Sequence, residues 1–381
     1  MSQLRTLVTV NLAAFLLMVG VGMIVAVLPA RVLALSGSLA QVSYIASAFA
    51  ISYLLVQVPL GRLADRIGFK PFLILGYGLC ALAGLLYVQA GAANGIFLGR
   101  FVQGIGEAPI WALGPALLAL AYPAARGRVI GAYNAAIHLG LMAGPLLGVW
   151  LFPSGGGAGA FWIFVALCLA AAVVTLLVLP RHRRQHLDQS VSITDVVMLM
   201  RRRGPAVTLL GILLYGAGYG SVVSVLPAYL ATAKGFDHAA VSLFFTLFYL
   251  AIGVAQLVVG PLSDRYGHAR FMIGGMAAAA LGLGAMPGVT APLIYLPIGV
   301  ASLGLGVFCV ASLADLSGRV PAAMKGTLAG SYYLAWGLGC FLGPLVIGAL
   351  GTVASASAGY YLLAGLMALQ SAALCLVARA R

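Results

Sequence analysis

This chain contains few charged residues. Asp, Glu, Lys and Arg make up 7% of its 381 residues, and 63% of the residues are hydrophobic. Soluble domains carry about 25% charged residues, and a soluble protein of this size could not cover its surface with so few. The composition therefore excludes an ordinary soluble domain. It predicts an all-α, multi-pass membrane protein, in which the 50 glycines would let helices pack closely.

Other absences narrow the function. The chain has no G-x-S-x-G, no H-E-x-x-H and no phosphate-binding loop. Its five cysteines lie singly in apolar runs, without metal-type spacing. We therefore expect no enzyme activity, no cofactor and no metal site. The net charge is +14, but no long basic run occurs, so we expect no nucleic-acid partner.

Long apolar runs are abundant. With about 20 residues as the length of a spanning helix, the sequence predicts an N-terminal six-helix half (1–180), a cytoplasmic linker (181–204) and a C-terminal six-helix half (205–381). Residues 191–200 of the linker are mildly amphipathic and could form an interfacial helix. The predicted spans are 7–30, 39–60, 71–91, 94–121, 128–152, 159–180, 205–231, 238–260, 270–289, 291–316, 326–350 and 358–379.

The basic residues predict the orientation. With the N-terminus inside, 18 of the 21 Lys and Arg fall on the inner side; Arg31 and Lys234 fall outside, and Arg100 lies within a span. This positive-inside bias predicts that both termini and the linker are cytoplasmic. The expected location is the plasma membrane, as for a bacterial inner-membrane protein.

The two halves repeat each other. VAVLPA (25–30) matches VSVLPA (223–228), and GRLADRIG (61–68) matches GPLSDRYG (260–267) 199 residues later. The glycine pattern of 131–145 returns at 330–344 with the same offset. A constant offset indicates two six-helix halves of the same orientation. Parallel repeats of this kind are typical of transporters whose substrate site lies where the halves meet.

Three motifs resemble one family. GRLADRIGFK (61–70) is similar to the signature between the second and third helices of the major facilitator superfamily, with Phe69 where a basic residue is usual. LGRFVQGIGEA (98–108) resembles the family's fourth-helix motif. G-x8-G-x3-G-P-x2-G (131–148) resembles the fifth-helix motif of twelve-span drug/proton antiporters, with Val149 in place of its final glycine. The resemblance implies the major facilitator fold, two pseudo-symmetric halves and alternating access.

The repeated charged motif is a candidate inner latch, by which we mean a contact at the inner surface that holds the two halves together in the outward-facing state. Asp65 is well placed to face the positive N-terminus of another helix, which the resemblance identifies as the eleventh. The alternative is a tight turn whose cations only fix topology. Asp315 could pair with Arg319, although the resemblance assigns it to the latch around Arg265. The second copy has His268 and Ala269 at the family's basic positions, so we expect it to be weaker. The proposed latch residues are Gly61, Asp65, Arg66, Gly68, Lys70, Asp264, Arg265 and Asp315.

One acid lies deep in a predicted span. Six of the seven acids fall in loops or near span ends, which leaves Glu107. Arg100 is two turns earlier on the same helix face, and His138 falls at a similar depth on the fifth span. An intramembrane charge is costly and is a functional candidate by default. We expect Glu107 to carry or gate a proton, with Arg100 and His138 tuning it; structural packing roles are the alternative for each.

Further residues are assigned to a substrate cavity and to a packing seam, which is a line of glycines and prolines where helices pack closely. The cavity candidates, of which Tyr332 and Tyr333 could instead be interfacial anchors, are Asn11, Trp111, Asn134, Tyr215, Tyr219, Tyr249, Tyr332, Tyr333 and Trp336. The seam candidates are Gly131, Gly140, Gly144, Pro145, Gly148, Gly330, Gly339, Gly343 and Pro344.

An aromatic pocket with one acid suits a small amphipathic compound, including a cationic one. The leading expectation is proton-coupled efflux of such a compound or of a metabolite by a monomer in the lipid bilayer. The alternative is a proton symporter for uptake of a small organic anion or metabolite, with Arg100 as the anion's partner.

Overall fold

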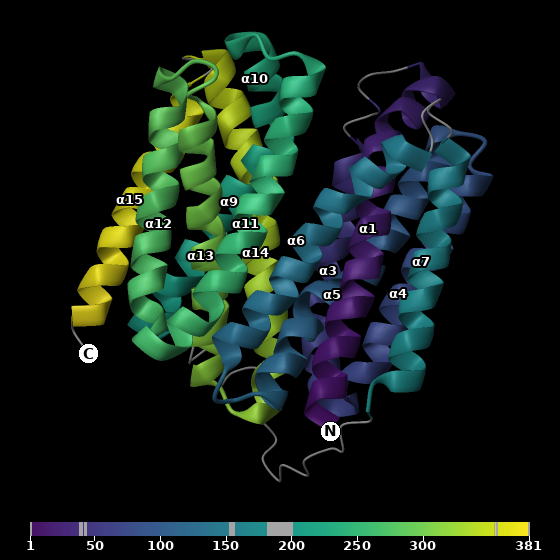
Figure 1. The fold of residues 1–381 in the computed structure, drawn as a ribbon, viewed down its shortest axis with the longest axis horizontal. Helices are drawn as coiled ribbons and strands as arrows, with labels where there is room; N and C mark the ends of the chain where they lie inside the picture. The colour runs from purple at the N-terminus through teal and green to yellow at the C-terminus, as the bar shows by residue number, and fades with distance from the viewer. Residues whose placement is uncertain are drawn as a thin grey trace. The chain divides into compact units, whose positions relative to one another are not determined.

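A computed structural model describes residues 2–37, 41, 44–151, 157–180, 201–353, 355 and 357–379. These residues are helical nearly throughout, and they include no strand (Figure 1). Twelve of the helices are long and apolar enough to cross a membrane. The prediction of an all-α protein with twelve spans is confirmed. The proposed interfacial helix at 191–200 lies outside the described residues.

The helices follow the predicted order. Those of the first half of the sequence are α1 (Ser2–Ser36), α3 (Tyr44–Ile67), α4 (Phe69–Gln89), α5 (Ala93–Ala121), α6 (Arg126–Leu151) and α7 (Gly157–Val178). Those of the second half are α9 (Arg203–Ser224), α10 (Leu226–Lys234), α11 (His238–Tyr266), α12 (His268–Ala285), α13 (Tyr295–Arg319), α14 (Lys325–Val353) and α15 (Ala358–Arg379). Two short 3-10 turns, Met286–Gly288 and Ala322–Met324, follow α12 and precede α14.

The predicted seventh span is interrupted. Residues 205–231 were expected to form one helix, but α9 ends at Ser224 and α10 begins at Leu226. Pro227 lies in the first turn of α10, where its missing N–H leaves no intrahelical bond unmade. The matching Pro29 lies inside α1, which continues to Ser36. The repeated VxVLPA segment therefore has different conformations in the two halves.

The GRLADRIG motif is mostly helix, not the turn that its polarity suggests. Residues 61–67 are the last part of α3, and residues 260–266 are the last part of α11. The chain reverses only at the next residue, which is Gly68 with φ 104° in the first copy and Gly267 with φ 89° in the second. Residues other than glycine are strained at such φ values, because their Cβ clashes with the backbone. The final glycine of each copy is thus explained by backbone conformation.

The chain forms two compact units. One comprises Met1–Tyr122, Ala136–Ser190 and Pro321–Tyr333; the other comprises Pro123–Ala135, Val191–Val320 and Leu334–Arg381. Each unit thus includes a segment of the other sequence half, namely the first part of α14 or of α6. In the first unit α4 packs on α5 and α7, and α1 on α7; in the second α12 packs on α13 and α15, and α9 on α15. The internal repeat of the sequence is therefore a repeat of helix packing.

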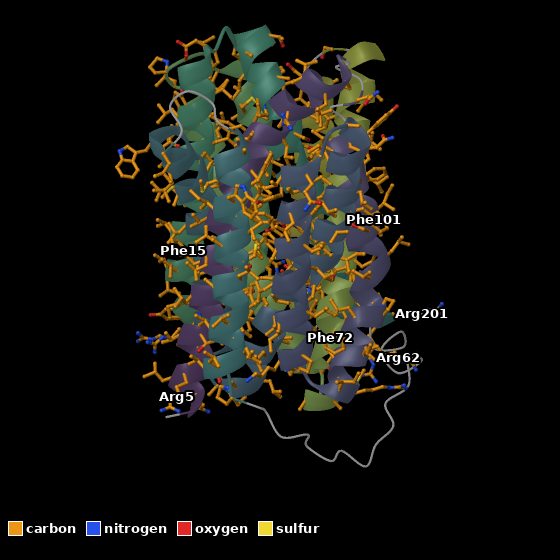
Figure 2. All side chains as sticks on the ribbon, turned by 90° about the vertical axis from the view of Figure 1, so that its right-hand side faces the viewer. Arg5, Phe15, Arg62, Phe72, Phe101 and Arg201 are labelled. Atoms are coloured by element: carbon orange, nitrogen blue, oxygen red, sulfur yellow. The ribbon has the colours of Figure 1, made fainter. Side chains whose placement is uncertain are left out.

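Basic residues gather at one end of the first unit. Arg5 near the start of α1 and Arg62 near the end of α3 lie at the same end of this unit, away from Phe101 (Figure 2). Phe101 is 39% exposed, and apolar side chains with similar or greater exposure occur along most spans. This distribution suits a surface that faces lipid along its length and polar headgroups at its ends.

Candidate functional site

Glu107 is buried in the middle of α5, with 3% of its surface exposed. Both of its carboxylate oxygens accept hydrogen bonds from the same helix. Gln103 Nε2 donates to Oε1 at 2.7 Å, and Trp111 Nε1 donates to Oε2 at 3.1 Å. The residues are four apart, so their side chains lie along one helix face. The acid that the sequence singled out is therefore the centre of a hydrogen-bonded ladder.

Gln103 connects Glu107 with Arg100 and is fully buried. Its Oε1 accepts from Tyr87 Oη at 2.5 Å and from Arg100 Nη1 at 3.1 Å. A guanidinium has no acceptor, so the amide oxygen must face Arg100 and the amide nitrogen must face Glu107. Arg100 also lies over the ring of Phe49, with 5.5 Å between Cζ and the ring centroid. Arg100 and Glu107 are thus linked through Gln103.

Trp111 brings two further predicted residues to this site. Its ring centroid lies 6.5 Å from that of His138 on α6 and 6.2 Å from that of Tyr333 on α14. The Tyr332 and Tyr333 rings are 5.1 Å apart. Both tyrosines are buried within the protein. Within the first unit, Glu107, His138 and Tyr333 therefore all contact the indole of Trp111.

The other aromatic candidates form a cluster in the second unit. The centroid of Trp336 lies 6.4 Å from that of Tyr215 and 5.5 Å from that of Tyr219. Phe248 packs against Tyr219 at 5.6 Å and against Tyr249 at 5.2 Å. All of these residues except Trp336 and Tyr249 are buried, and those two are half-buried. The cluster offers π faces and phenol groups, but its described rings surround no acid.

The two candidate asparagines bond to their own helices. Asn11 Nδ2 donates to Leu7 O at 2.7 Å, and Asn134 Nδ2 donates to Ile130 O at 3.0 Å. Asn11 is half-buried and Asn134 is buried. In this conformation each amide satisfies a donor locally, so neither is joined to the Glu107 ladder by these bonds.

Asp65 caps the start of α14. Its Oδ1 accepts from Gly326 N and its Oδ2 from Thr327 N, both at 2.7 Å, and Thr327 Oγ1 adds a third bond to Oδ2 at 2.6 Å. These are the second and third residues of α14, whose first N–H groups have no intrahelical acceptor. A carboxylate there also lies at the positive end of the helix dipole. The predicted helix partner is observed at this aspartate.

Asp264 repeats this cap in the second unit. Its Oδ1 and Oδ2 accept from Gly127 N and Arg128 N at 2.8 Å each, and these are the second and third residues of α6. All three positions are offset by 199 from those of the first cap. His268 Nε2 lies 3.9 Å from Asp264 Oδ1. The second copy therefore keeps the cap, with two hydrogen bonds where the first copy has three.

Glycines allow both caps to form. A Cβ added to Gly61 would lie against the carbonyl group of Gly326, and one added to Gly260 would lie 2.5 Å from Gly127 O. A Cβ on Gly326 would in turn lie 2.5 Å from Gly61 O, and one on Gly127 would lie 2.5 Å from Gly260 O. Neither pair of helix backbones could approach this closely with any side chain at the crossing.

The remaining latch candidates have other partners. Lys70 Nζ donates to Leu176 O at 2.8 Å and Leu179 O at 2.5 Å, at the C-terminal end of α7, where a cation is stabilising. Asp315 holds Arg319 through two bonds of 2.7 Å. Arg265 lies over the Tyr266 ring, and Arg66 is exposed. The ion pairs among the described residues join Asp315 to Arg319 and Asp264 to His268, and neither includes Arg265.

The seam glycines divide into two groups. Gly131 and Gly330 abut α11 and α3, at the carbonyls of Gln256 and Gln57. The later ones pack on the first helix of their own sequence half. Gly140 and Gly144 abut α1, and Gly339 and Gly343 abut α9. A Cβ added to Gly148 would make only an ordinary contact, 3.9 Å from Met23 Cγ. Pro145 and Pro344 both lie inside their helices.

Sequence reasoning missed three buried amides. Gln103 lies within the fourth-helix motif, and the spacing of 100, 103, 107 and 111 puts four polar or aromatic residues on one helix face. Gln57 and Gln256 are fully buried. Neither amide atom of either residue has a hydrogen-bond partner among the described residues. Their offset of 199 was the available signal.

Comparisons with known proteins agree with this fold. The sequence model of the Major Facilitator Superfamily matches residues 10–237 and 208–381, and the chain belongs to this family. It is 27% identical to the tetracycline resistance protein, class C, of Escherichia coli over 87% of this chain and 86% of that protein. It is 29% identical to the class G protein of Vibrio anguillarum, again over 87% and 86%.

A solved structure supports the same fold. The crystal structure of the human organic anion transporter MFSD10 (TETRAN) superposes with a TM-score of 0.85 at 17% sequence identity. The match covers 98% of this chain and 100% of that one. Family, relatives and fold all indicate a multi-pass membrane transporter.

Proposed function

We propose that this protein exports a small amphipathic compound or metabolite in exchange for protons, by alternating access. The observation that carries the proposal is the burial of Glu107 between two hydrogen-bond donors, at 3% exposure. A carboxyl group in a spanning helix is expensive to keep charged, and such groups mark proton relays. Two relatives are named for resistance to tetracycline, and resistance favours export of a compound over its uptake.

The substrate class follows from the groups near the acid. Trp111, which donates a hydrogen bond to Glu107, and Tyr333, which packs against Trp111, are large π faces. A compound with an apolar body and a positive charge could use the rings for cation–π contact and the carboxylate for charge pairing. Proton binding at Glu107 and substrate binding at the same carboxylate would then exclude each other. Such competition at one group is a physical basis for exchange.

The variant Glu107→Gln tests this proposal. Purified protein in vesicles should lose proton-driven substrate transport by about a hundredfold, the scale of a removed proton-transfer group. Asp237→Asn is the matched control, because this exposed acid caps α11 at Ala240 N and Asn is an equally good cap. Proton-driven transport at the wild-type rate by Glu107→Gln would refute the assignment.

A second candidate function is uptake of a small organic anion with protons. The observation that favours it is Arg100, whose buried Nε has no hydrogen-bond partner among the described residues. Such a group could receive a carboxylate or phosphate through two parallel bonds. The direction of substrate flux under an imposed pH gradient separates the two. Accumulation on the acidic side supports the exporter, and accumulation on the alkaline side supports the symporter.

The cellular setting belongs to the same proposal. The basic residues of the predicted inner loops favour a plasma membrane with both chain ends in the cytoplasm, as in a bacterial inner membrane. The Glu107 ladder lies within one chain, so a monomer would suffice for transport. Labelling of single cysteines introduced at the two chain ends, in sealed membrane vesicles of known orientation, tests the topology.

A further inference from the structure

The hydrogen bonds of the Glu107 ladder suit the deprotonated form of the acid. Indole Nε1–H can only donate, and the amide of Gln103 must turn its NH₂ group to Glu107 because Arg100 occupies the oxygen side. Both carboxylate oxygens thus face obligate donors. An added proton would reduce the accepting capacity of one oxygen. One of the two hydrogen bonds must then weaken.

The two donors are not held equally. Gln103 is fully buried and is fixed by two further bonds, to Tyr87 and to Arg100. The side chain of Trp111 has one hydrogen-bonding group, its Nε1–H, which donates to Glu107 at 3.1 Å, and its ring contacts include those with His138 and Tyr333 at centroid distances of 6.5 and 6.2 Å. Ring contacts tolerate sliding better than a buried amide tolerates loss of its bonds. The weakened bond is therefore the one to Trp111.

The other groups around Glu107 do not change this conclusion. Its electrostatic neighbours are Arg100 on α5, Tyr87 and Cys80 on α4, and Cys168 on α7. His138 on α6 lies beside the indole of Trp111, with 6.5 Å between the ring centroids. Thiols and phenols are mainly uncharged at neutral pH. The guanidinium of Arg100 is then the one fixed cation of this set, and it acts through Gln103.

The indole touches the helix that carries the first cap. Tyr333 lies seven residues, or about two turns, after Gly326 on α14. Gly326 N and Thr327 N are the donors to Asp65. Both ends of this short stretch, like Glu107 and Trp111, belong to one compact unit. A shift of the Trp111 ring would thus push on the helix segment that ends at the Asp65 cap.

We propose that Trp111 is the positioning residue that passes the charge state of Glu107 to the start of α14 through Tyr333. This inference rests on the proposed proton coupling at Glu107. Proton uptake weakens the Nε1–H bond, the indole moves against Tyr333, and the first turn of α14 loosens from Asp65. Trp111 thereby connects proton binding with the latch, in addition to facing substrate.

A double-mutant cycle tests the connection. Glu107→Gln imitates the protonated acid, because an amide has one oxygen and leaves one of the two donors without an acceptor. Trp111→Phe keeps a ring but removes the donor. Hydrogen–deuterium exchange of the peptide 325–333 is the readout. Glu107→Gln should speed this exchange several-fold in the wild-type background and leave it unchanged in the Trp111→Phe background.

The matched control is Trp162→Phe, the same change at an indole on α7 that is 54% exposed. In that background the effect of Glu107→Gln should stay at its wild-type size. If Trp111→Phe fails to fold, Tyr333→Leu breaks the next contact and should likewise abolish the effect. An equal effect of Glu107→Gln with and without Trp111, or no effect in any background, overturns the inference.

A transport assay run in parallel separates the two proposals. Trp111→Phe should lose most of the dependence of efflux on the pH gradient, whereas Trp162→Phe should keep it. If wild-type efflux does not depend on that gradient, the proposed function fails, whatever the exchange data show. If wild-type efflux is proton-driven and Trp111→Phe is coupled like the wild type, only the role of Trp111 fails.

Discussion

At the residue scale, buried amides divide into those that are paired and those that are not. Gln103 uses its oxygen twice and its nitrogen once, and so orders the site around Glu107. Gln57 on α3 and Gln256 on α11 are equally buried, but their amide atoms find no partner among the described residues. A buried polar group without a hydrogen bond costs about 1–3 kcal/mol. These two positions therefore destabilise the observed conformation.

Gln57→Met should accordingly stabilise the protein. Methionine has a similar length and no polar hydrogen, so the change removes the unmet bonds while filling the same volume. We expect a gain of about 1–3 kcal/mol, visible as a higher melting temperature in detergent. Gln256→Met should behave alike, and Gln103→Met, which breaks three bonds, should lower the melting temperature. A lower melting temperature for Gln57→Met would mean that its amide is satisfied after all.

Single residues also show what the sequence could and could not reveal. Glu107 stood out because it is the one acid deep in a predicted span. Its ladder could have been predicted as well, since residues four apart on a helix share a face. The ring contacts of Trp111 with His138 and Tyr333 could not, because they depend on how three helices approach each other. No periodicity along one chain segment encodes that approach.

At the scale of elements, glycine decides how closely two helices cross. α3 meets the start of α14 at Gly61 and Gly326, and α11 meets the start of α6 at Gly260 and Gly127. The carboxylates of Asp65 and Asp264 reach the backbone N–H groups only because these helices touch backbone to backbone. Side-chain volume at the crossing is therefore linked directly to hydrogen bonding at the caps.

Gly61→Ala should destabilise the protein, because its Cβ would lie 2.8 Å from Gly326 C in a contact that only backbone movement can relieve. Overpacking of this kind costs about 1–3 kcal/mol. Gly78→Ala is the matched control on α4, since a Cβ there meets no atom within 4 Å. The control should gain about 0.5–1 kcal/mol from helix propensity. Melting temperatures that move in the same direction for both variants would contradict this account.

Element ends were harder to predict than element existence. Lys70 follows the repeated motif and was assigned to the latch, yet it caps α7 from more than 100 residues away in sequence. Local sequence cannot indicate such a partner. The extension of α3 and α11 through the charged motif was missed for a different reason. Two arginines and an aspartate resemble a loop by polarity, whereas the helix ends only where Gly68 or Gly267 adopts positive φ.

At the scale of the whole molecule, duplication is the dominant feature. The offset of 199 residues predicted matching structure, and the two caps match bond for bond in their backbone contacts. The expectation that the second copy would be weaker rested on His268 and Ala269. The structure locates a difference elsewhere, in Thr327, whose hydroxyl gives Asp65 a third bond. Arg128 occupies the equivalent position in the second unit.

Asp65→Asn and Asp264→Asn compare the two copies during transport. Each replaces a carboxylate oxygen by an NH₂ group that faces a backbone N–H. The lost charge-assisted bond is worth about 1.5–3 kcal/mol, or about tenfold to a hundredfold in the equilibrium between capped and uncapped states. Both variants should reach the membrane and transport more slowly. We expect the larger loss for Asp65→Asn.

Thr327→Val decides whether that inequality comes from the hydroxyl. It removes only the third bond and leaves the two backbone donors, as in the second copy. Its transport rate should fall between those of the wild type and Asp65→Asn. If the difference between the copies lies in Thr327, Asp65→Asn and Asp264→Asn should lower the transport rate equally when each is combined with Thr327→Val. Initial rates in vesicles, normalised to protein in the membrane, provide the comparison, and a wild-type rate for both aspartate variants would remove the caps from the transport cycle.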